Sequence, residues 1–166
     1  MIEEPLILTL ELDSDSFEWL NDLRKSYFPK ERNLLSAHLT LFHKLTLAQV
    51  EFMKAVLWRS PSGVVPLEFV GLRSLGGGVA VEVRAPDLVA LRKTFVAAVD
   101  GDLTPQDGQG FRPHVTIQNK VTAAVARQTL ATLQRDFTPR AGQGTALMVW
   151  RYLGGPWALH ERLELV

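Results

Sequence analysis

The sequence contains no cysteine among its 166 residues. Disulfide bridges, thiolate metal sites and cysteine nucleophiles are therefore excluded. No apolar run approaches the roughly 20 residues that a membrane-spanning helix needs. The acidic start, Met-Ile-Glu-Glu-Pro, also lacks the basic and apolar regions of a secretory signal. These features predict a cytoplasmic protein that does not associate with a membrane.

A surplus of positive charge is missing as well, because 18 Lys and Arg residues balance 18 Asp and Glu residues. A protein that coats long nucleic acid neutralises many phosphates with basic side chains, so this class is disfavoured. A small site that grips one phosphate or one RNA end stays compatible with zero net charge. The composition, 46% hydrophobic and 22% charged, is ordinary for a globular protein, and the length predicts a single domain over residues 1–166.

A nine-residue pattern occurs twice in the chain. The first copy begins at His38 and reads HLTLFHKLT, and the second begins at His114 and reads HVTIQNKVT. The copies lie 76 positions apart (114 − 38 = 76) and agree in identity at four places. The repeat predicts a duplicated strand-helix unit, in which each His-x-Thr forms half of a site facing one cleft.

Apolar-polar alternation predicts strands, and helical spacing with capping residues predicts helices. The expected strands span residues 6–12, 37–45, 66–73, 79–84, 113–121, 145–153 and 158–165, and the expected helices span 15–27, 47–59, 86–99 and 123–137. Ser14, Thr46 and Thr122 are expected to cap helices. Residues 76–78 and 154–156 are expected turns, and residues 100–112 and 139–144 are expected loops.

Side chains alternate between the two faces of a strand, so His38, Thr40 and Phe42 are expected on one face. His114 and Thr116 share a face in the second copy. Two imidazoles on opposite sides of phosphorus can act as base and acid in breaking a phosphodiester. Threonine hydroxyls can donate hydrogen bonds to the non-bridging oxygens. The pattern therefore predicts two catalytic histidines and two phosphate-binding threonines.

This chemistry requires no metal or cofactor, and the chain contains neither an H-E-x-x-H motif nor a dense carboxylate cluster. Three further residues are candidates for substrate contacts. Phe42 could stack on a nucleobase, and Arg112 is either a phosphate contact or a plain surface charge. Tyr152 lies on a strand face that either packs in the core or presents aromatic rings to a base. His43, on the face opposite the first catalytic histidine, is expected to be structural.

The segments HLTL at 38–41 and FRPHVTI at 111–117 resemble the two-histidine (2H) phosphoesterase superfamily, in its bacterial 2′-5′ RNA ligase-like branch. The order of elements is similar over nearly the whole chain. The resemblance implies an α+β fold that is bilobal, with two pseudo-symmetric lobes of antiparallel sheet and flanking helices around a central cleft. It also implies two antiparallel sheets, catalytic His38 and His114, and phosphate-binding Thr40 and Thr116.

The activity implied by the resemblance is metal-independent opening of a 2′,3′-cyclic phosphate, commonly to a 2′-phosphate, or 2′-5′ joining of RNA ends. We therefore expect a monomeric hydrolase that acts on an RNA end or nucleotide cyclic phosphate without a cofactor. Two alternatives stay open: a binding module that senses a nucleotide or RNA end without turnover, and a cyclic phosphodiesterase for a small metabolite such as an ADP-ribose cyclic phosphate. Intact His and Thr in both copies count against the pure binding module.

Overall fold

The computed structural model describes residues 5–99 and 103–166. The elements are β1 (Leu6–Leu12), α1 (Ser14–Tyr27), the 3-10 turn η1 (Lys30–Arg32), β2 (Leu39–Leu45), α2 (Leu47–Arg59), β3 (Val65–Ser74), β4 (Val79–Arg84), α3 (Pro86–Ala98), α4 (Pro105–Gly108), β5 (His114–Gln118), α5 (Ala123–Gln134), β6 (Arg140–Tyr152) and β7 (Trp157–Glu164). Each motif strand is followed by a helix and then by two strands, which confirms the order expected for a duplicated unit. The α+β fold class is also confirmed.

The seven strands described form one antiparallel sheet in the order β2-β1-β6-β3-β4-β5, and β7 also pairs with β6. The two sheets implied by the resemblance are therefore continuous. Their link is β6, which is 13 residues long. One of its edges pairs with β1, while β3 and β7 take successive stretches of the other edge. Each half of the sheet thus has four strands that include β6, and a motif strand lies at the outer edge of each half.

The segment at residues 139–144 is strand rather than the expected loop, because β6 begins at Arg140. Its glycines indicated a loop, but in the structure they allow β6 to pack closely against neighbouring residues. A Cβ built on Gly144 would lie 2.5 Å from the side chain of Leu10 on the neighbouring β1. A residue with a side chain would therefore push the two strands apart, and glycine lets β6 pass close to β1.

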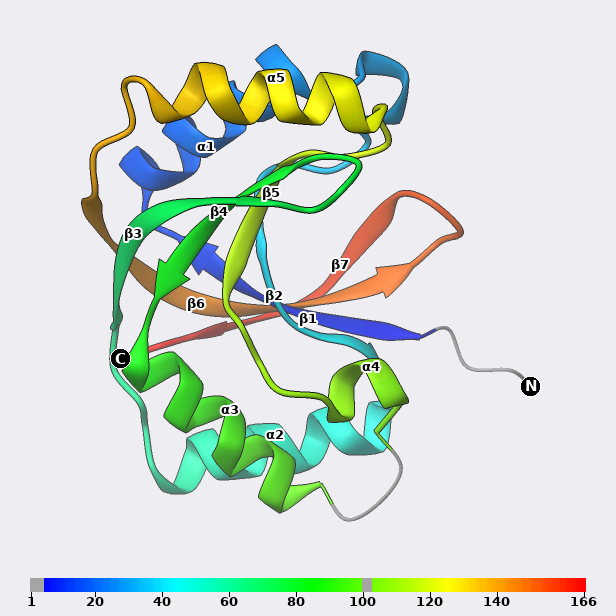
Figure 1. Cartoon of the computed structure of the whole chain (residues 1–166). Helices are drawn as coiled ribbons and strands as arrows, with labels where there is room; N and C mark the ends of the chain where they lie inside the picture. Colours follow the sequence, from blue (N-terminus) through cyan, green and yellow to red (C-terminus); the bar gives the residue numbers. More distant parts are fainter. Residues whose placement is uncertain (1–4, 100–102) are drawn as a thin grey trace.

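Two pairs of helices flank the sheet. Figure 1 shows α1 with α5 on one side of the strands and α2 with α3 on the other. Apolar residues of these helices join those of the strands in one buried core, whose largest fully buried side chains include Phe42, Phe69, Phe95, Leu88 and Met53. No helix within the described residues is long and apolar enough to cross a membrane.

Several local expectations hold, and others need correction. Thr46 caps α2 in a capping box with Gln49, and Thr122 caps α5. The cap of α1 is Asp13 rather than Ser14, since the Asp13 carboxylate accepts the backbone N–H of Ser16. The second motif strand ends at residue 118 and α5 at residue 134, both earlier than expected. The expected loop at 100–112 contains the short α4, and its residues 100–102 lie outside the described part.

Candidate active site

The two motif strands lie at opposite ends of the strand order, yet they contact each other in the folded chain. The sheet is therefore curved enough to bring β2 and β5 side by side, as Figure 1 shows. His38 and Thr40 of the first copy, and His114 and Thr116 of the second, are all half-buried. The charge of His114 also acts on His38. The fold thus brings together the four residues that the repeat singled out.

Both histidines make the same hydrogen bond to the backbone two residues earlier. Nδ1 of His38 donates to the carbonyl oxygen of Ser36 at 2.7 Å, and Nδ1 of His114 donates to that of Arg112 at 2.9 Å. A carbonyl oxygen can only accept, so Nδ1 carries a proton in each ring. This leaves Nε2 of each ring for a substrate, as an acceptor when the ring is neutral and as a donor when it is protonated.

The two imidazoles differ in their electrostatic surroundings. Burial lowers the pKa of His38 to about 4, and the positive charges of Arg24, His114 and His43 act in the same direction. Burial also lowers the pKa of His114, with Arg73 and His43 adding to the effect, but the negative charge of Glu82 opposes it. Both pKa values are lowered, so each free ring favours its neutral form at neutral pH, and the two rings differ in that His114 has the carboxylate of Glu82 acting on it.

Each motif strand contains a β-bulge at the third residue after its histidine. In the first copy Thr40 pairs with Thr9 and Phe42 pairs with Leu8, so Leu41 is the extra residue. In the second copy Thr116 and Gln118 pair with consecutive residues of β4, so Ile117 is the extra residue. A bulge reverses the alternation of faces beyond it. The expected assignment of side chains to the two strand faces is therefore correct as far as Thr40 and Thr116 and wrong for the residues that follow them.

The bulge removes Phe42 from the cleft. Its side chain is fully buried, and the guanidinium of Arg92 lies 4.4 Å from its ring centroid. A nucleobase cannot stack on a ring that is enclosed in the core, so the expectation of a substrate contact at Phe42 is wrong. The matching residue of the second copy, Gln118, is buried in the same way and donates to Thr129 Oγ1 at 2.8 Å.

Two buried arginines that sequence reasoning missed support these irregular strands. Arg92 of α3 donates from Nε to the carbonyl of the bulged Leu41 at 2.9 Å. Arg24 of α1 donates from Nη1 to the carbonyl of Thr116 at 2.8 Å. Burial lowers the pKa of Arg24 to about 10, which leaves it charged at neutral pH. Helical spacing gives no signal for such residues, because their partners lie 51 and 92 positions away.

The two other candidate contacts lie at the margins. Arg112 is largely exposed and forms an ion pair with Glu82, so its guanidinium already has a carboxylate partner. Tyr152, at the end of β6, is 43% exposed and is not among the residues that line the pocket beside His38. The contacts of these two residues thus place neither side chain against the histidines.

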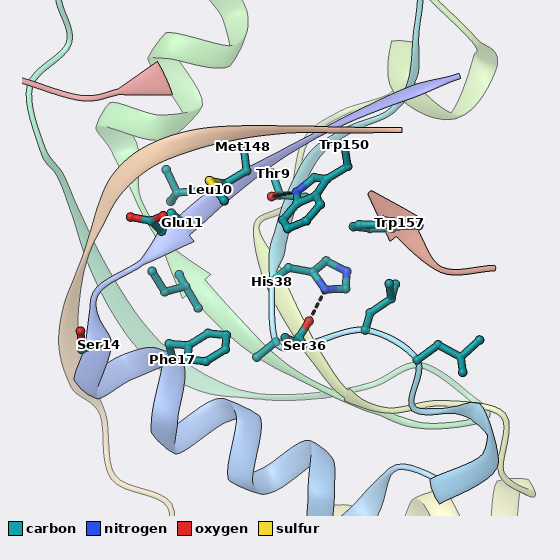
Figure 2. Close-up of a pocket in the computed structure, with 14 residues that line it drawn as sticks. Thr9, Leu10, Glu11, Ser14, Phe17, Ser36, His38, Met148, Trp150 and Trp157 are labelled. Atoms are coloured by element: carbon teal, nitrogen blue, oxygen red, sulfur yellow. Dashed lines mark hydrogen bonds between the residues drawn. The ribbon is translucent and has the colours of Figure 1, made fainter. Parts of the chain in front are cut away.

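A pocket of about 500 Å³ opens beside His38. Figure 2 shows Trp150 and Trp157 on one side of it, Phe17 across from them, and Glu11 at the end away from His38. The ring centroids of His38 and Trp157 lie 4.8 Å apart, and Trp150 Nε1 donates to Thr9 Oγ1 at 2.9 Å. A flat apolar group with a few polar atoms would fit these walls. The alternating face of the last long strand indicated Trp150, but nothing local marked Trp157.

A metal centre has no support in the described residues, since nowhere in 5–99 or 103–166 do three or more His, Cys, Asp or Glu side chains form a group that could hold an ion.

The model of the 2′-5′ RNA ligase superfamily matches residues 12–156. The chain belongs to the 2′-5′ RNA ligase superfamily. Members of this superfamily are phosphoesterases and ligases, which supports phosphoesterase or RNA-end-processing activity for the chain in general terms. No curated protein matches the sequence.

Solved structures share the fold at low sequence identity. Escherichia coli LigT complexed with 3′-AMP matches with a TM-score of 0.66 and 17% identity, over 98% of each chain. The same protein complexed with ATP matches with a TM-score of 0.63 and 16% identity, also over 98% of each chain. Usb1 of Kluyveromyces marxianus matches with a TM-score of 0.50 and 15% identity, over 97% of each chain. The superfamily fold therefore extends over nearly the whole chain.

Proposed function

We propose that this protein opens a 2′,3′-cyclic phosphate at an RNA or nucleotide end, with His38 and His114 as its base and acid. The observation that carries the proposal is the matched pair of imidazoles. In each ring Nδ1 donates a hydrogen bond to a backbone carbonyl, which leaves Nε2 for the substrate. Each motif also contains a half-buried threonine two residues after its histidine. Such a pair supplies both proton transfers that cleavage of a phosphodiester requires.

We assign the two roles by the one difference in surroundings, the carboxylate of Glu82, which acts on His114 and partly offsets the lowering of its pKa. His38, whose pKa is lowered to about 4, is neutral and accepts the proton of the attacking water. The water oxygen bonds to phosphorus while the bond from phosphorus to one ribose oxygen breaks. His114, which has the charge of Glu82 nearby, gives its proton to that leaving oxygen. Thr40 and Thr116 donate hydrogen bonds to the non-bridging oxygens, where negative charge increases in the transition state.

The pocket beside His38 supports a nucleoside as the group that carries the phosphate. Its volume of about 500 Å³ and its aromatic walls suit a base and ribose. LigT, which has a similar fold, has been solved in complex with 3′-AMP and with ATP, and both ligands are nucleotides. We therefore place the base against Trp150 and Trp157.

The test is hydrolysis of nucleoside 2′,3′-cyclic phosphates in the presence of EDTA, with products resolved as 2′- or 3′-monophosphates. We expect one isomer from the wild type, and a loss of several orders of magnitude in kcat for His38→Ala and for His114→Ala. His160→Ala is the matched control, because His160 is an exposed histidine on β7. Tight nucleotide binding with no product at any pH would instead establish a binding module. Turnover of ADP-ribose cyclic phosphate alone would establish the small-metabolite enzyme.

A further inference from the structure

A third histidine lies on the cleft face of β2. Beyond the bulge at Leu41, Leu8 pairs with Phe42 and Leu6 pairs with Leu45, so the single residue between them on β1 opposes both His43 and Lys44. That residue, Ile7, points to the same face of β1 as Thr9, which pairs with Thr40. His43 therefore shares the face of Thr40, whereas simple alternation from His38 places it on the opposite face.

The ring of His43 is held by a buried carboxylate. Asp107, whose side chain is fully buried, accepts the backbone N–H of His43 at 2.8 Å and its Nδ1–H at 3.0 Å. Its other oxygen accepts the backbone N–H of Lys44 at 2.9 Å. Burial alone would raise the pKa of Asp107, but these hydrogen bonds outweigh burial and lower it. The carboxylate is thus ionised, Nδ1 is the donor, and Nε2 is directed away from Asp107 in a side chain that is 47% exposed.

Basic side chains lie at this end of the cleft. His43 acts electrostatically on both His38 and His114. Arg73 also acts on His114, but its guanidinium is paired with the carboxylate of Glu82 at 3.4 Å. Lys44, beside His43, is exposed. The pocket beside His38, by contrast, is walled mainly by aromatic and aliphatic side chains. The cleft therefore has an apolar end that suits a base and an end where the exposed His43 and Lys44 can donate hydrogen bonds to an anion.

We propose that His43, oriented by Asp107, binds a second phosphate of the substrate. The ligand would then carry a phosphate besides the one between the catalytic histidines, as the terminal nucleotide of an RNA chain does. An exposed imidazole Nε2 held by a buried carboxylate forms a charge-assisted hydrogen bond to such a group. This inference rests on the proposed function, because it takes the ligand to be a nucleotide whose first phosphate lies between His38 and His114.

The experiment is calorimetric titration with adenosine 2′-monophosphate and with adenosine 2′,5′-bisphosphate, which differ only in the second phosphate. We expect the wild type to bind the bisphosphate about ten-fold more tightly, the size of one charge-assisted hydrogen bond. His43→Gln should bring the two affinities to within about two-fold of each other. His160→Gln, at the exposed histidine of β7, should keep the wild-type preference.

The inference is overturned if the wild type does not prefer the bisphosphate. It is also overturned if His43→Gln keeps the wild-type preference for the bisphosphate. Asp107→Asn removes the ionised partner of His43 and keeps only one of the two oxygens, which can accept the backbone N–H of His43 or that of Lys44 but not both. We expect this variant to lose part of the preference, whereas an equal loss for both nucleotides would assign Asp107 a purely structural role. If the wild type turns over cyclic nucleotides but His43→Gln still prefers the bisphosphate, this inference is wrong and the proposed function stands. Binding of neither nucleotide and no turnover contradict the proposed function as well.

Discussion

Acid should destabilise this protein through His38, and the size of the effect follows from the burial of its ring. The pKa of His38 is lowered from 6.5 to about 4 in the folded chain. The unfolded chain therefore binds this proton more readily, and stability falls as the pH drops from 6.5 towards 4. At pH 4.5 the difference between the two pKa values corresponds to a loss of about 2.5 kcal/mol in the free energy of unfolding. Because the side chain is only half-buried and solvent screens part of its charge, we expect about 1–2 kcal/mol.

The assay is urea unfolding of the wild type and of His38→Gln at pH 7.5 and at pH 4.5. Glutamine does not titrate, so the wild type should lose about 1–2 kcal/mol more than the variant between the two pH values. The variant serves as the control for every other group, including His114, whose pKa is also lowered by burial. Equal losses in the two proteins, or an NMR titration of the His38 ring near its ordinary pKa, would refute the reasoning.

Other perturbations test the supports of the site. Arg24→Met leaves the carbonyl of Thr116 without its donor, so urea unfolding should show a loss of about 1–3 kcal/mol, with a fall in kcat; an unchanged kcat would contradict its role. Gly144→Ala places a Cβ 2.5 Å from the adjacent side chain of β1, and thermal unfolding should show a loss of about 1–3 kcal/mol. Gly110→Ala, where the structure leaves open space, should cost far less. Trp157→Ala should raise KM for nucleoside cyclic phosphates about ten-fold with little change in kcat. An unchanged KM would contradict the placement of the nucleobase in this pocket.

Much of the fold could be predicted from residues that are close in sequence. Thr46 with Gln49 marked the start of α2, and Thr122 marked the start of α5. The glycines at 76–78 marked the turn between β3 and β4, where Gly76 has a positive φ of 83°. These signals depend on caps and turns, which are decided by a few neighbouring residues. The repeat of His-x-Thr was visible for the same reason, since each copy is contiguous.

The bulges could not be predicted, and they decided which side chains share the cleft. Alternation assumes a regular ladder, so Phe42 was placed beside the catalytic residues and His43 away from them. The structure reverses both positions, because Leu41 is inserted in the pairing with β1. A bulge depends on the partner strand and on what holds the freed backbone groups. Here Arg92 holds the Leu41 carbonyl, and Asp107 holds the N–H of His43.

The candidate site combines both kinds of information. The identities of His38 and His114, and their pairing with threonines, were present in the linear pattern of the chain. The approach of β2 to β5, the aromatic wall at Trp157 and the buried guanidinium of Arg24 exist only after folding. Residues 92 positions apart, such as Arg24 and Thr116, meet because the curved sheet and its helices bury a common core. Local patterns thus named the reacting groups, while long-range packing set their protonation, their supports and the shape of the cleft around them.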